Sequence, residues 1–150
     1  MENQIGNVKP LMEADRARWN ELWKGYQEFY KADIPAEVSD LTWRRFHDDN
    51  EPMFALGCFV DGYLVGIAHY IFHRSCWTVG DYCYLQDLFT DFEFRGRGVA
   101  RALIEELYRV AVAAGASRVY WLTQETNEVA RSLYEKVAER SGFIQYRKLL

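Results

Sequence analysis

The sequence lacks several features that would assign it to a membrane, secreted or metal-binding class. It has no uninterrupted run of about 20 apolar residues, the length that a membrane-spanning helix needs, and its first residues do not resemble a secretion signal. It has only three cysteines, Cys58, Cys76 and Cys83, with no CxxC pair. We therefore expect a cytoplasmic protein whose thiols are reduced and lie buried or half-buried in strands, with neither disulfides nor a metal site.

Proline is also scarce. Only three prolines interrupt the chain, and there are no internal repeats or low-complexity segments. Hydrophobic residues make up 49% and aromatic residues 16% of the 150 residues, a composition that excludes a disordered or fibrous protein. The length and composition together predict one domain over residues 1–150 with a sizeable core.

No continuous basic stretch suggests a nucleic-acid partner. The net charge of −4 is unevenly distributed: residues 1–94 carry 8 Lys/Arg and 16 Asp/Glu, giving −8, and residues 95–150 carry 10 and 6, giving +4. This asymmetry suits two ligands of opposite sign, one anionic and one cationic, although ordinary variation in surface charge would also produce it.

The pattern of apolar residues predicts a mixed sheet with helices on its faces, which is an α/β (α+β) fold. Asp61-Gly62 is typical of a hairpin turn, and Gly115 and Asn127 are typical of a helix end and a helix start. The expected helices begin at Asp15, at Ser39 or Asp40, at Val99 and after Asn127. The expected strands span Ile5–Lys9, Met53–Val60, Tyr63–Phe72, Tyr82–Thr90, Arg118–Leu122 and Phe143–Leu149.

The segment RGRGVA, residues Arg95–Ala100, follows a predicted strand and opens a predicted helix. Gly96 and Gly98 have no Cβ, so the backbone can approach a ligand closely and direct N–H groups at it. The partial positive charge of a helix start and the neighbouring arginines favour an anion such as a pyrophosphate. The alternative is a tight turn between strand and helix with incidental arginines.

Two other phosphate-binding motifs do not fit this segment. A dinucleotide-binding fingerprint needs a third glycine or alanine where Arg101 stands. A P-loop needs an ending of Gly-Lys-Ser/Thr, which is absent here.

The segment Arg95–Ala100 resembles the coenzyme A motif of the GNAT superfamily of N-acetyltransferases, Gln/Arg-x-x-Gly-x-Gly/Ala. NEVARSLYEK at Asn127–Lys136, followed by Gly142-Phe143, is similar to a second segment of that family. YLQDLFT at Tyr84–Thr90 is similar to the preceding strand in the spermidine/spermine acetyltransferase branch. The resemblance covers essentially the whole chain. It implies a mostly antiparallel GNAT-type sheet, acetyl-coenzyme A as cosubstrate, no metal, and transfer of the acetyl group to a primary amine.

The same resemblance implies how the cofactor is held. The strand before the glycine turn would pair with the pantetheine arm like an added strand, and one of its N–H groups would polarise the thioester carbonyl. Asn127 would contact this arm in addition to capping its helix. The cofactor-binding residues implied are Leu88, Phe89, Thr90, Arg95, Gly96, Arg97, Gly98, Val99, Ala100, Asn127 and Tyr134.

Catalytic roles follow from the resemblance in part. Tyr134 corresponds to the general acid that protonates the departing coenzyme A sulfur, with simple packing as the alternative. Relatives usually place Glu then Asp in the strand before the turn, where this chain has Gln86 and Asp87. Gln86 cannot take a proton, so Asp87 is the candidate for binding the ammonium group or acting through water. His69 and His73 are alternatives, although histidines in strands are more often structural.

The acceptor is predicted from the composition of residues 28–51, where carboxylates and aromatic rings suit a cationic amine. Tyr30, Gln86 and Asp87 are the candidate substrate-binding residues, and a polyamine or basic amino acid is the expected substrate. A protein lysine or amino terminus is an alternative acceptor, and a non-catalytic coenzyme A-binding module is an alternative function. Since only one strand follows the last helix, an unpaired sheet edge predicts a homodimer or higher homo-oligomer.

Overall fold

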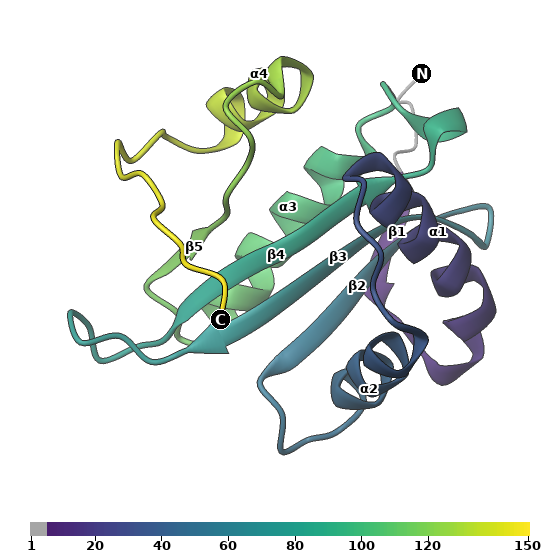
Figure 1. Cartoon of the computed structure of the whole chain (residues 1–150), viewed down its shortest axis with the longest axis horizontal. Coiled ribbons are helices and arrows are strands. Elements are labelled where there is room, and N and C mark those ends of the chain that lie inside the picture. The colour runs from purple at the N-terminus through teal and green to yellow at the C-terminus, as the bar shows by residue number, and fades with distance from the viewer. Residues whose placement is uncertain (1–5) are drawn as a thin grey trace.

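The computed structural model describes residues 6–150 of the 150-residue chain (Figure 1). Its five-stranded sheet has the order β1-β2-β3-β4-β5. The first three pairings are antiparallel and the β4–β5 pairing is parallel, which confirms the predicted mixed, mostly antiparallel sheet. The strands are β1 (Asn7–Pro10), β2 (Met53–Val60), β3 (Tyr63–His73), β4 (Tyr82–Thr90) and β5 (Arg118–Tyr120).

Helices cover both faces of this sheet (Figure 1). On one face α1 and α2 enclose a core around Trp19, a side chain with no exposed surface. On the other face α3 buries Leu103, Ile104 and Leu107 against the sheet. The helices are α1 (Arg16–Phe29), α2 (Ala36–Phe46), α3 (Val99–Ala113) and α4 (Glu128–Val137), with short 3-10 turns η1 (Glu13–Asp15) and η2 (Phe92–Phe94).

The hairpin between β2 and β3 forms where the sequence predicts it. Asp61 has a φ of 50° and Gly62 a φ of 78°, so both central residues are left-handed, as the two-residue turns that match strand twist require. Val60 is paired with Tyr63 directly beside the turn. The turn therefore sets the register in which β3 is presented to β4.

Close packing at Gly66 seats the start of α3 on β3. A Cβ on this residue would lie 2.6 Å from Cγ1 of Val99, a distance that real side chains do not reach. The absence of a side chain lets the first turn of α3 approach the sheet beside the end of β4, because Gly66 is paired with Thr90. The predicted helix start is thus held next to the strand that precedes it.

The second helix begins earlier than the sequence indicated. α2 starts at Ala36, and not at Ser39 or Asp40, because Pro35 has the φ of −54° that suits a helix start. Ser39 has another role, since its Oγ accepts a hydrogen bond from Nε1 of Trp23 at 3.0 Å. This bond joins α2 to α1.

The last predicted strand, Phe143–Leu149, is wrong. Residues 138–150 form neither helix nor strand, and the side chains of Phe143, Ile144 and Tyr146 are 82%, 73% and 88% exposed. An alternating pattern favours a strand only where a neighbouring strand can pair with it, and none does so among the described residues. The first predicted strand is found at β1, and Ile5 lies outside the described residues.

Two of the three cysteines lie buried in strands, as predicted. All three are free thiols; Cys58 and Cys83 are buried in β2 and β4, whereas Cys76 is exposed in the loop that joins β3 to β4. The expectation of a half-buried strand position is therefore wrong for Cys76, which lies beyond the end of β3.

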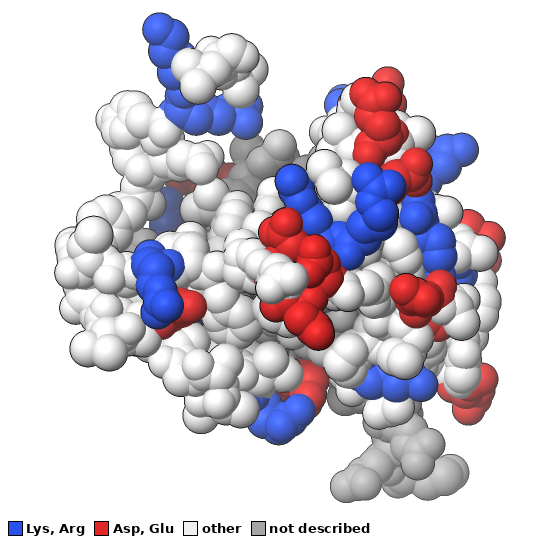
Figure 2. Space-filling model, turned by 90° about the horizontal axis from the view of Figure 1, so that it is seen from below, with Lys and Arg blue, Asp and Glu red and all other residues white. Residues whose placement is uncertain are grey.

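The face of the molecule shown in Figure 2 carries both signs of charge. Acidic side chains gather near its middle and basic side chains lie directly beside them. No continuous basic surface is present on this face. None of the helices within residues 6–150 combines the length and the apolar character needed to span a membrane.

Candidate active site

Strands β4 and β5 separate soon after they meet. They pair over three residues only, Tyr82–Tyr84 with Arg118–Tyr120, and Figure 1 shows β5 leading away toward α4. β4 continues to Thr90, and from residue 85 onward its β5 side has no strand partner within residues 6–150. Residues 88–90, predicted to hold the cofactor arm, lie on this stretch. Apart from the Thr90 carbonyl, which accepts a hydrogen bond from Arg95, the backbone groups that point to this side are suited to an extended ligand.

A β-bulge occurs in the same part of β4. His69 of β3 is paired with Asp87, but the next residue, Tyr70, is paired with Leu85, so Gln86 is the extra residue. Because successive strand residues face opposite sides, this insertion puts Asp87 and Leu85 on different faces of the sheet. Leu85 packs in the core under α3 and Asp87 faces α1. Gln86 itself is exposed.

The glycine turn has the backbone that the sequence predicts. Gly96 has a φ of 74° and Gly98 a φ of 81°, in the left-handed region that residues with a Cβ rarely adopt. Gly98 is the N-cap of α3, and its carbonyl accepts a hydrogen bond from the N–H of Ala102 at 3.0 Å. The helix leaves its first N–H groups without intrahelical partners, those of Val99 and Ala100 among them. The arrangement can therefore bind an anion.

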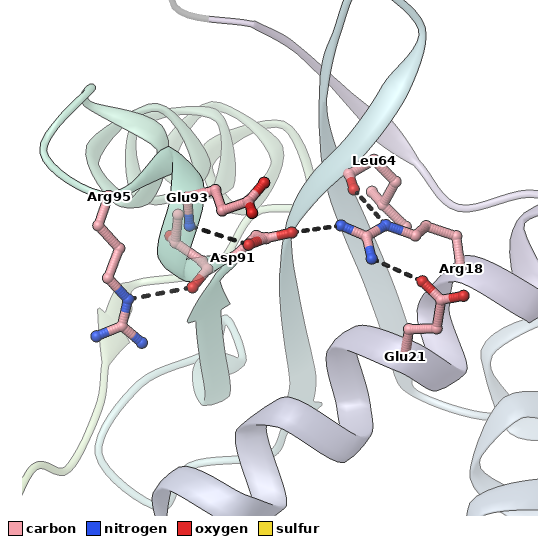
Figure 3. A network of polar contacts seen from close by, with 7 residues as sticks. Arg18, Glu21, Leu64, Asp91, Glu93 and Arg95 are labelled. Carbon is pink, nitrogen blue, oxygen red and sulfur yellow. Dashed lines mark hydrogen bonds and ion pairs between the residues drawn. The ribbon is translucent and has the colours of Figure 1, made fainter.

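Asp91 joins this turn to the rest of the protein (Figure 3). One oxygen of its carboxylate accepts a hydrogen bond from the N–H of Glu93 at 3.0 Å, and the other accepts one from Arg18 at 2.6 Å. Arg18, on α1, also donates to the carbonyl of Leu64 at 2.9 Å and to the carboxylate of Glu21 at 2.7 Å. These contacts hold α1, β3 and the approach to the glycine turn in one arrangement.

The arginines of the turn contact protein groups with their side chains. Nε of Arg95 donates to the carbonyl of Thr90 at 3.2 Å, and its guanidinium lies 4.0 Å from the ring centre of Phe92. The Arg97 guanidinium lies 5.1 Å from the ring centre of Phe94. The side chain of Arg95 therefore braces the turn, and a ligand at the helix start would meet the backbone first.

Asp87 is the centre of a polar site between β4 and α1, and its side chain is 13% exposed. Its Oδ2 lies 3.0 Å from Nδ1 of His69, whose Nε2 lies 2.9 Å from Nε1 of Trp19. His69 therefore belongs to this site, although the sequence alone favoured a structural role. His73 lies four residues further along β3, where its Nε2 is 2.7 Å from the hydroxyl of Tyr120. The structure thus brings only one of the two candidate histidines to Asp87.

Three tyrosines lie close to the Asp87 carboxylate. Burial raises the pKa of Tyr26, and the charge of Asp87 raises it further. The same two causes, in the same order, raise the pKa values of Tyr30 and Tyr84. Tyr30 was a predicted acceptor residue, whereas Tyr84 was missed. Regular alternation would put Tyr84 and Asp87 on opposite faces of β4, and only the bulge brings them to one face.

The segment from Asn127 to Tyr134 borders the opening between β4 and β5. Oδ1 of Asn127 accepts a hydrogen bond from the N–H of Ala130 at 3.5 Å, so the predicted helix cap is confirmed. The ring of Tyr134 packs against that of Trp121, with 5.3 Å between the ring centres. Burial raises the pKa of Tyr134 to about 12, and the neighbouring Tyr30 adds to this effect. The Tyr134 hydroxyl therefore keeps its proton at neutral pH.

Comparison with known proteins places these features in a family. The model described as the acetyltransferase (GNAT) family matches residues 18–138. The chain is 37% identical to a D-amino-acid N-acetyltransferase of Saccharomyces cerevisiae, over 94% of this chain and 89% of that protein. It is 29% identical to the thialysine N-epsilon-acetyltransferase of Mus musculus, over 93% of this chain and 90% of that protein.

Solved structures share the fold. A probable acetyltransferase superposes with a TM-score of 0.84 at 21% identity, over 96% of this chain and 97% of that one. A ribosomal-protein-alanine N-acetyltransferase of Brucella melitensis superposes with a TM-score of 0.78 at 24% identity, over 96% and 99%. At these identities the likeness establishes the arrangement of the sheet and its helices.

Proposed function

The chain belongs to the acetyltransferase (GNAT) family, and from this premise we propose that it acetylates the primary amine of a small cationic acceptor, such as a polyamine or a basic amino acid. The family is one of N-acetyltransferases that use acetyl-coenzyme A as cosubstrate. The position of Asp87 is the main observation in favour of a cationic acceptor. Its carboxylate is largely buried, is contacted by His69 and has tyrosines around it, which suits an ammonium group.

The proposed cofactor site combines the open edge of β4 with the start of α3. The pantetheine arm would pair with residues 88–90, and an N–H of this edge would donate to the thioester carbonyl. The pyrophosphate would lie at the glycine turn, Arg95–Ala100, where free N–H groups and the helix dipole favour an anion. Asn127 would contact the arm from the opposite side of the opening.

The proposed chemistry assigns separate roles to Asp87 and Tyr134. Attack on the thioester needs a neutral amine, whereas a primary amine with a pKa near ~10 is mostly protonated at neutral pH. Asp87 would bind the ammonium form and take up its proton directly or through water, with Tyr30 and the exposed Gln86 as further contacts. Tyr134 would donate its proton to the departing sulfur, which its raised pKa of about 12 permits.

The relatives support a small acceptor. The names of the two proteins reported above are those of enzymes that act on D-amino acids and on thialysine, which are amino-acid-sized amines. The proposed acceptor site has one carboxylate near tyrosines of α1 and β4, an arrangement that suits a single ammonium group. We therefore favour a small amine as the acceptor over the lysine side chain or amino terminus of a protein.

A panel of acceptors tests this proposal. Release of the coenzyme A thiol would be followed with polyamines, basic and neutral amino acids in both stereochemical forms, and a lysine-containing peptide. We expect turnover with the small cationic amines and little with neutral amino acids. Efficient acetylation of the peptide without turnover of small amines would favour the alternative acceptor.

The proposed pyrophosphate site is tested by Gly96→Ala, with Gly62→Ala as matched control. Both glycines have similar positive φ values, 74° and 78°, and a Cβ at either would meet nothing within 4 Å. Each substitution should therefore destabilise the fold by a similar amount, on the order of 1–2 kcal/mol. We expect only Gly96→Ala to weaken acetyl-coenzyme A binding, by about tenfold, in calorimetric titrations. Equal affinities in the two variants would contradict a cofactor role for the turn.

We also propose that the chain forms a homodimer or higher homo-oligomer through the residues after α4. Among the described residues β5 is the last strand of the sheet, and the apolar side chains of Phe143, Ile144 and Tyr146 after α4 are exposed. Light scattering should give a multiple of 17.7 kDa. Ile144→Lys should lower this mass, whereas Val129→Lys, at an exposed position of α4, should not.

A further inference from the structure

A chain of two hydrogen bonds fixes the protonation of His69. The indole N–H of Trp19 can only donate, so Nε2 of His69, 2.9 Å away, must accept. The ring proton is then on Nδ1, which donates to Oδ2 of Asp87 at 3.0 Å. Trp19 has no exposed surface and His69 is 3% exposed, so water cannot replace either partner without rearrangement.

This arrangement has a consequence for charge. With a neutral His69, the pair of His69 and Asp87 carries one negative charge. A second proton on His69 would cancel that charge, and it would also direct an Nε2–H group at the N–H of Trp19. Two donors facing each other in a buried site are costly because neither can be satisfied.

The other groups around His69 offer no substitute for this contact. Tyr26 of α1 and Tyr30, directly after that helix, lie near Asp87, as Tyr84 of β4 does. From α2 the Phe46 ring packs 4.7 Å from the His69 ring centre, and from β2 the paired residue is Ala55. Two further charged or titratable groups, Arg16 and His47, lie against the rings of Trp19 and Trp43.

We propose that Trp19, acting through His69, keeps the pair of His69 and Asp87 at a net charge of −1 at mildly acidic pH, so that the site retains its affinity for a cationic amine. Trp19 and His69 are thus positioning residues of the acceptor site. This inference rests on the proposed function only in naming the ligand. The protonation of His69 is a property of the protein alone.

The test is Trp19→Phe, which keeps an aromatic ring and removes the N–H donor. The matched control is Trp23→Phe on the same helix, since the indole of Trp23 also packs on His69, at 4.9 Å, but donates to Ser39. Nitrogen-15 NMR would follow the His69 ring between about pH 5.5 and 8, the range that brackets an ordinary imidazole titration. We expect no titration in the wild type or in Trp23→Phe, and a second proton on the ring at low pH in Trp19→Phe.

Binding of 1,4-diaminobutane to the enzyme loaded with coenzyme A gives the second readout. The amines of this probe stay protonated over the same range, so any pH dependence belongs to the protein. Affinity should be constant in the wild type and should weaken about tenfold toward low pH in Trp19→Phe. The double variant Trp19→Phe/His69→Asn is the rescue experiment. The asparagine amide can still donate to Asp87 and cannot become charged, so the affinity of this variant for the diamine should again be independent of pH.

Four results would decide between these proposals. A wild-type His69 that titrates normally, or a Trp19→Phe variant that does not titrate, overturns the inference. Titration in Trp19→Phe without a change in diamine affinity overturns the role of the pair in amine binding. A wild type that keeps His69 neutral but does not bind the diamine counts against the proposed acceptor and leaves the role of Trp19 in protonation intact.

Discussion

Tyr134→Phe is expected to lower kcat about 10²–10³-fold, which lies within the usual contribution of a general acid. The substitution removes one hydroxyl and keeps the ring that packs on Trp121, so acetyl-coenzyme A should bind with little change. The raised pKa of Tyr134, about 12, means that the hydroxyl is fully protonated across the working range. A loss of proton donation should therefore appear in kcat at every pH between 6 and about 9.

Tyr70→Phe is the matched control for this prediction. Burial also raises the pKa of Tyr70 to about 12, and Tyr70 lies in the core of β3 away from the opening between β4 and β5. The kcat of the Tyr70→Phe variant should equal that of the wild type. If Tyr134→Phe retains full kcat when the chemical step is shown to limit turnover, Tyr134 is a packing residue and the acid must be sought elsewhere.

Much of the framework could be predicted from local sequence signals. The Asp61-Gly62 turn fixes the β2–β3 hairpin, and Gly98 and Asn127 begin the helices that flank the proposed cofactor site. These features depend on a few adjacent residues, since a positive φ or a helix cap requires particular side chains at particular positions. The prediction of the glycine turn was accordingly correct in both its position in the chain and its backbone conformation.

The residues of the proposed acceptor site could not be predicted from local signals in the same way. His69 and Asp87 are 18 residues apart and become neighbours only through the register of β3 with β4. The bulge at Gln86 has no local signature in the sequence, yet it decides which face Asp87 and Tyr84 share. Long-range pairing also explains the error at Phe143–Leu149, because an alternating pattern does not specify a partner strand.

The glutamine at position 86, where the resemblance implies a glutamate, can be understood from the bulge. The resemblance to the spermidine/spermine acetyltransferase branch implies a carboxylate at this position, but Gln86 is the exposed extra residue of the bulge, whereas Asp87 is contacted by His69. A single largely buried carboxylate thus remains for the proposed ammonium group. On this proposal the acceptor site depends on Asp87 more strongly than a site with two carboxylates would.

Asp87→Asn is therefore expected to reduce kcat/KM for a cationic amine by about 10²-fold or more, the scale on which loss of one member of a buried charge pair is felt. Asparagine has nearly the same size and can still accept the hydrogen bond from Nδ1 of His69, so the fold should be retained. The negative charge is lost, and the KM for the amine should rise. The KM for acetyl-coenzyme A should not change, because the proposed cofactor contacts are made by the β4 edge and the glycine turn.

The control is Asp81→Asn, just before the same strand, where the carboxylate forms an exposed ion pair with Arg74. An exposed ion pair contributes little to the stability of the fold, so Asp81→Asn should have the kinetics of the wild type.

A second experiment introduces Gln86→Glu into the Asp87→Asn variant and tests whether a carboxylate elsewhere in the bulge can replace Asp87. Because residue 86 is exposed and is not contacted by His69, we expect at most a small recovery. Full recovery would mean that the site requires only a nearby negative charge, and an Asp87→Asn enzyme with unchanged amine kinetics would remove Asp87 from the acceptor site.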